Sequence, residues 1–142
     1  MANYYGTIRT NYFSVKDPVA FRQLLDSVSA EDHVHLFETK QDDGSVRYGF
    51  GCNGSIYGIP AESEEDECEE DLDCFYDALQ QLLCDGEAII ITEVGYEKLR
   101  YVVGISTIIT RTDIRSIDIQ CTALDAAREM LGNPNYQTQM DY

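Results

Sequence analysis

Residues 87–110 most constrain the fold, because two long segments of strand-forming residues flank a short polar connection. The segments EAIIITEVG and LRYVVGISTIIT are rich in β-branched and aromatic residues, and GYEK joins them. Such composition favours β-strands, and a short connection favours antiparallel pairing of two neighbouring strands. The pattern therefore predicts a long β-hairpin.

Three other segments have the apolar spacing of amphipathic helices. The first begins at Asp17, a favourable N-cap that precedes Pro18, and runs to about residue 29. The second covers 72–83 and carries acidic residues in its first turns, which suits the positive end of the helix dipole. The third covers 121–131 and ends before Gly132.

Further strands are predicted where β-branched and aromatic residues gather between turn signals. The longest such segment is broken by glycines, so it forms one long strand or two short ones. Its glycines indicate a bulge or a close approach of another backbone. The predicted strand segments are 4–15, 33–40, 46–59 and 114–119.

The order of the predicted elements indicates an α+β fold. The first six elements match the split β-α-β, ferredoxin-like arrangement, and a C-terminal hairpin and helix extend it. We expect a mainly antiparallel sheet with helices on one face. The length of 142 residues and the absence of a linker predict one domain over 1–132, followed by a loose tail over 133–142.

The charge of the chain is extreme, with 26 acidic and 10 basic residues and a net charge of −16. Such a chain repels phosphate backbones and anionic lipids, so direct nucleic-acid or membrane binding is disfavoured. From Tyr48 to Glu97 there are fourteen acidic residues and no Lys or Arg. This asymmetry predicts a polarised surface.

Five cysteines, an odd number, and a polar N-terminal segment favour free thiols in a reducing cytoplasm. No apolar segment approaches the length of a membrane span.

Motifs for catalysis or for a metal are absent from the sequence. Nothing marks a nucleophile, and the acidic run lacks the glycine and the register of a calcium-binding loop. Cys68 and Cys74 are six residues apart, and we expect His33 and His35 on opposite faces of a strand. This spacing is not that of a structural zinc site. We therefore predict no cofactor and no metal.

The acidic run AESEEDECEEDLDCFYD, residues 61–77, contains ten acidic residues and no basic one. It is either a solvated loop and helix start, or a negative surface that docks on a basic protein with electrostatic steering. In one form of docking, carboxylates replace DNA phosphates and occupy a nucleic-acid-binding groove. The predicted partner-binding residues are Glu64, Glu65, Asp66, Glu67, Glu69, Glu70, Asp71 and Asp73.

The segments GTIRTNYFSVKD and EVGYEKLRYVVG resemble a group of small, uncharacterised acidic proteins of bacterial phages and conjugative elements. The resemblance implies a cytoplasmic accessory role and supplies no catalytic residues. The charge is also similar in kind to that of anti-restriction and anti-CRISPR inhibitors, an analogy that rests on size and charge alone.

The sequence therefore predicts a non-enzymatic acidic binding protein, with two alternatives left open. One is a self-assembling protein that forms a homodimer through a sheet edge or a tyrosine-rich face. Strand segments themselves favour tyrosine, however, and half of each such side chain can pack on the core. The other is a small enzyme with dispersed catalytic residues, which a deep pocket lined by His33 or His35, Cys52 and a carboxylate would favour.

Overall fold

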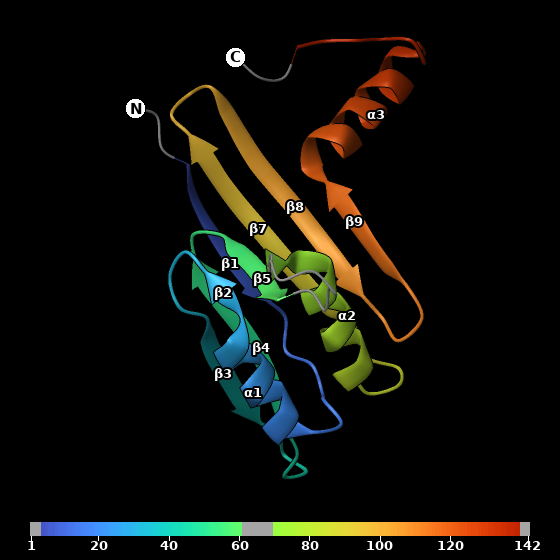
Figure 1. The fold of residues 1–142 in the computed structure, drawn as a ribbon. Helices are drawn as coiled ribbons and strands as arrows, with labels where there is room; N and C mark the ends of the chain where they lie inside the picture. The colour runs from blue at the N-terminus through green and yellow to red at the C-terminus, as the bar shows by residue number, and fades with distance from the viewer. Residues whose placement is uncertain (1–3, 61–69, 140–142) are drawn as a thin grey trace.

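The computed structural model describes residues 4–60 and 70–139 and has an α+β fold (Figure 1). Within those ranges there are three helices, one large antiparallel sheet and one small sheet. The α+β class and the mainly antiparallel sheet that the sequence predicts are confirmed.

Six strands form the large sheet, and every neighbouring pair is antiparallel. Their order across the sheet is β3-β4-β1-β7-β8-β9. The predicted hairpin is confirmed, because β7 and β8 pair over nine residues each. The strands are β1 (Tyr5–Thr10), β3 (His35–Lys40), β4 (Val46–Asn53), β7 (Ile89–Glu97), β8 (Tyr101–Ile109) and β9 (Ile114–Asp118).

The small sheet has the order β2-β5-β6. Its strands are β2 (Ser29–Ala30), β5 (Ile56–Pro60) and β6 (Glu70–Asp71). The glycine-broken segment of the sequence is thus two strands, β4 and β5. Gly54 lies between them with a φ of 91°, a left-handed conformation that glycine adopts without a steric penalty.

The three helices are α1 (Pro18–Ser27), α2 (Leu72–Leu82) and α3 (Ile119–Leu131). The predicted N-cap of α1 is confirmed, because the Asp17 carboxylate accepts hydrogen bonds from Val19 N and Ala20 N, each 3.1 Å long. Gly132 closes α3 in a left-handed conformation with a φ of 63°. Local signals in the sequence therefore place these helix ends well.

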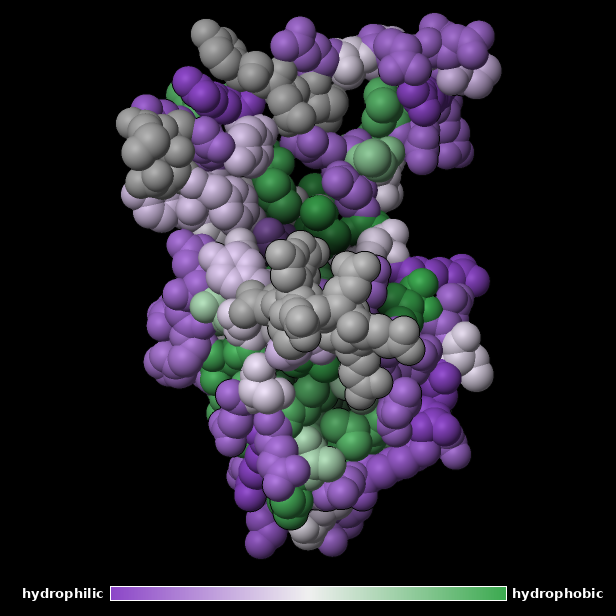
Figure 2. Space-filling model, viewed as in Figure 1, coloured by the Kyte–Doolittle hydropathy of each residue, from purple (hydrophilic) through white to green (hydrophobic). Residues whose placement is uncertain are grey.

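The core lies between the large sheet and α1 and α2, which pack on one of its faces. Phe13, Phe21, Phe50 and Phe75 are fully buried there and contact one another edge-on or tilted. The helix α3 contributes no buried side chain and lies at the far end of the sheet, beyond β9 (Figure 1). Apolar surface is visible between that end of the sheet and α3 (Figure 2).

The first strand is shorter than the predicted segment 4–15, because the side chain of Asn11 ends the pairing with β7. Asn11 Oδ1 accepts a hydrogen bond from Ile90 N at 2.8 Å, and Nδ2 donates to Ala88 O at 3.0 Å. The amide group thus takes the place of a backbone partner. The chain then turns inward, and Phe13 forms an isolated bridge with Tyr48.

Candidate binding surfaces

Five of the eight predicted docking residues lie outside the described residues. They are Glu64, Glu65, Asp66, Glu67 and Glu69. The backbone of a sixth, Glu70, pairs with Pro60 in the small sheet. Asp71 and Asp73 alone have described side chains, and these two differ in role.

Asp71 is the N-cap of α2. Its Oδ1 accepts hydrogen bonds from Asp73 N at 2.8 Å and from Cys74 N at 3.4 Å. These bonds satisfy backbone donors that have no partner within the helix. The Asp71 carboxylate therefore stabilises the start of α2. Because one of its oxygens already accepts these hydrogen bonds, it is less available to bind a cationic partner.

Asp73 is exposed, and Asp77 follows it one helical turn later and is also exposed. Residues four apart lie on the same side of a helix. Neither carboxylate forms an ion pair with any residue that the structure describes. Asp77 was missing from the predicted set, although its spacing from Asp73 on a predicted helix was the signal that could have found it.

Most cationic side chains are already paired elsewhere in the molecule. Arg9 lies over the ring of Phe37, with its guanidinium carbon 4.6 Å from the ring centroid. The other six arginines pair with carboxylates as Arg22–Glu38, Arg47–Glu87, Arg100–Glu97, Arg111–Asp85, Arg115–Asp113 and Arg128–Asp125. Because these arginines are paired with nearby groups, the excess of negative charge lies on other surfaces.

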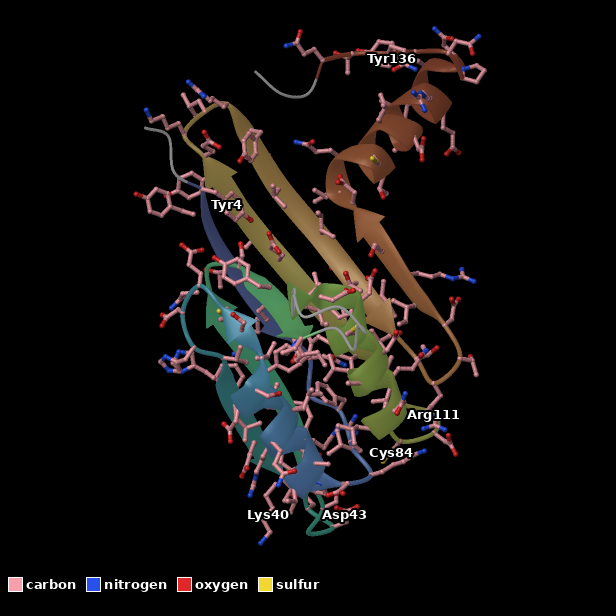
Figure 3. All side chains as sticks on the ribbon, viewed as in Figure 1. Tyr4, Lys40, Asp43, Cys84, Arg111 and Tyr136 are labelled. Atoms are coloured by element: carbon pink, nitrogen blue, oxygen red, sulfur yellow. The ribbon has the colours of Figure 1, made fainter. Side chains whose placement is uncertain are left out.

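Arg111, in the loop after β8, lies beside the C-terminal end of α2. Its Nη1 donates to Gln81 O at 3.3 Å and to Leu83 O at 3.4 Å, and its Nε lies 3.3 Å from Asp85 Oδ1. Figure 3 shows Arg111 beside this end of the helix, near Cys84. A cation here satisfies free carbonyl groups and suits the helix dipole. Among the described residues, no ion pair provides a counter-charge for the acidic N-terminal half of α2.

The thiol of Cys74 reports the negative potential around α2. Burial raises its pKa, and the carboxylates of Asp71 and Asp77 raise the pKa further. We expect a D77N variant to lower the pKa of Cys74, because removing a nearby negative charge favours the thiolate. Alkylation of Cys74 by iodoacetamide at about pH 8.5, followed by peptide mass spectrometry, should then be about two- to threefold faster. An unchanged rate would contradict the inference that the Asp77 carboxylate raises the pKa of Cys74. The exposed Cys121 serves as the internal control for the alkylation rate.

A hollow of about 1240 Å³ lies at the end of the sheet where β1, β7 and β8 meet. Tyr4 lines it and donates a hydrogen bond from Oη to Glu93 Oε2 at 2.7 Å (Figure 3). Burial and the Glu93 carboxylate raise the pKa of Tyr4. Its ring covers Gly6 and Gly95, where any added Cβ would come within 2.7 Å of the Tyr4 hydroxyl.

The lining that would favour a small enzyme is not found in this hollow. Glu31 and Asp32 line it, whereas His33, His35 and Cys52 do not. The expectation that the two histidines face opposite ways is wrong, because their ring centroids are 4.0 Å apart. His33 lies two residues before the start of β3 at His35, and both rings are exposed. Cys52 is buried, and burial raises the pKa of its thiol.

Among the described residues, no three His, Cys, Asp or Glu side chains are arranged to hold a metal ion. Cys68 lies outside those residues. None of the helices in the described ranges is long and apolar enough to cross a membrane.

Comparison of the chain with family models, with curated proteins and with solved structures gives no match.

Proposed function

We propose that this chain is a non-enzymatic, acidic binding protein that docks the outer surface of α2 on a basic protein. The observation that carries the proposal is the pair Asp73 and Asp77, exposed on one side of α2 and without an ion-pair partner in the described ranges. The sequence adds the acidic run immediately before the helix. Unpaired carboxylates grouped on one surface steer the approach of a cationic partner.

The proposed partner class is a nucleic-acid-processing protein that the chain inhibits by imitating DNA. Asp73 and Asp77 are separated by about 6 Å along the helix axis, a spacing that lets both meet neighbouring cations of one groove. Lysine and arginine side chains that bind successive phosphates are such cations. As part of the same proposal, the chain acts in the cytoplasm as an accessory protein of a phage or conjugative element. Its inhibition is of the anti-restriction or anti-CRISPR type.

We also infer that the core is a ferredoxin-like unit. Its support is the strand order β3-β4-β1-β7, with α1 between β1 and β3 and α2 between β4 and β7. In this arrangement α1 and α2 lie side by side on one face, so the outer surface of α2 is presented to solvent. The strands β8 and β9 and the helix α3 extend this unit.

The test compares the wild-type chain with a D73N/D77N variant as bait in a bacterial lysate. At about 50 mM salt, where surface charges are weakly screened, wild type should retain basic nucleic-acid-binding proteins. A short DNA duplex and added salt should each release them. The variant should bind such a protein about three- to tenfold more weakly, because it lacks two charges of the docking surface.

A D42N/E129Q variant is the matched control, because it removes the same number of charges from exposed residues outside α2, one between β3 and β4 and one in α3. It should retain the captured proteins as wild type does. Equal loss in both variants would show that total charge matters and that the α2 surface does not. Retention that a DNA duplex does not affect would rule out DNA imitation while leaving docking intact.

A further inference from the structure

Neither α1 nor α2 covers the opposite face of the large sheet, which the described part of α3 approaches at Gly104 of β8, where Ile119 lies against the strand. Residues directly opposite in antiparallel strands share a face. Tyr5 faces Tyr96, which faces Val102, and the two tyrosine ring centroids are 5.8 Å apart. We call this surface, formed by the strand residues on the side away from α1 and α2, the open face.

Exposed apolar side chains from β1, β7, β8 and β9 gather on the open face. Tyr5, Val94, Tyr96 and Val102 are each more than half exposed, at 58%, 54%, 52% and 59%. Single exposed apolar side chains are ordinary, but a contiguous group of them marks an interaction surface. The exposed apolar residues of this face are Tyr5, Ile90, Val94, Tyr96, Val102 and Ile117.

Charge is segregated between the two faces of the large sheet. Its six strands contain four carboxylates, and register places all of them on the face toward α1 and α2. These residues are Glu38, Glu93, Glu97 and Asp118. The open face carries no strand carboxylate and holds Arg9, Arg47 and Arg115. The carboxylates of Glu87 and Asp113, which lie outside the six strands, pair there with Arg47 and Arg115, so in a chain of net charge −16 this face has no strand carboxylate and its neighbouring acids are neutralised.

We infer that the open face is the contact between two copies of this chain, packed sheet against sheet. Repulsion between two chains of this charge opposes contact through any acidic surface. The open face is a surface on which two copies meet without bringing strand carboxylates together, and its neighbouring Glu87 and Asp113 are already paired with arginines. Packing there buries the apolar side chains and keeps both acidic helix layers on the outside, as far apart as the dimer allows.

The size of the open face suits a stable dimer. Six strands about 4.8 Å apart, with the nine-residue β7 and β8 about 30 Å long, cover on the order of 700 Å². A standard interface buries roughly 800 Å² on each partner. Nucleic acid is the less favoured occupant, because the arginines of this face are already engaged with Glu87, Asp113 and the ring of Phe37.

The test is the molar mass of the full chain in solution, measured by sedimentation equilibrium. Wild type should have twice the chain mass of 16.1 kDa. A V94E variant should have the mass of a single chain, with dimerisation weakened at least about a hundredfold, because each copy would bury a carboxylate at the contact. A V19E variant adds the same charge on the exposed side of α1 and should remain dimeric.

A wild-type chain that stays at 16.1 kDa at about 100 µM, or a folded V94E variant that stays dimeric, overturns the proposal. Circular dichroism establishes that V94E is folded. Salt separates this contact from docking by α2: screening should strengthen the dimer and weaken the binding of a basic partner. Binding of a single-stranded oligonucleotide by a monomeric wild type would instead assign the open face to nucleic acid and overturn the dimer.

Discussion

A Phe50→Ala variant is expected to lose about 3–5 kcal/mol of its free energy of unfolding. Phe50 is fully buried on β4, and its ring lies 5.8 Å from that of Phe75 on α2 and 6.4 Å from that of Phe13. Alanine would remove these contacts and leave a cavity between α2 and the sheet that neither element can fill by moving. The loss is a large part of the total for a domain of this size, about 5–15 kcal/mol. Urea unfolding at one fixed protein concentration measures it.

Tyr57→Ala is the control for Phe50→Ala, because Tyr57 is an aromatic residue on β5, the next strand along the chain, and is 47% exposed. Its cost should be below about 1 kcal/mol, as for most surface substitutions. If the two variants unfolded at the same urea concentration, Phe50 would not join α2 to the sheet as described. The comparison matters for function, since α2 carries the proposed docking residues.

Local sequence signals predicted the elements of the fold because each signal acts over a few residues. Asp17 before Pro18 marks the start of α1, and Gly132 marks the end of α3, as the structure confirms. The hairpin of β7 and β8 needed a short connection and strand-forming residues alone. Such features depend on hydrogen bonds and steric limits within one segment, so they can be inferred without the rest of the chain.

The candidate surfaces were only partly predictable, because they depend on pairing between distant segments. The acidic run is plain in the sequence, but the use of Asp71 as an N-cap depends on where α2 begins. The sequence suggested a tyrosine-rich face but not which residues form it, since Tyr5 and Tyr96 become neighbours only when β1 pairs with β7. The contact of His33 and His35 was also missed, although a spacing of two residues in a strand favours it.

A Gly58→Ala variant is expected to be destabilised by about 3–5 kcal/mol and to disturb the start of α2. Gly58 lies in β5 with a φ of 118°, which is unfavourable for any residue with a Cβ. A Cβ there would also lie 2.3 Å from Asp71 O and 2.6 Å from Leu72 N. These are backbone atoms at the N-terminus of α2, so relief of the clash requires movement of the helix or of the strand.

Gly86→Ala separates the two causes, because Gly86 has a φ of 78° and no atom within 4 Å of an added Cβ. That variant should cost about 1–3 kcal/mol from backbone strain alone, and the excess in Gly58→Ala is the cost of the clash. Equal losses in urea unfolding would mean that the contact between β5 and α2 yields freely. A larger loss in Gly58→Ala, with weaker capture of basic proteins at temperatures where it remains folded, would tie the close approach of β5 to the placement of Asp73 and Asp77.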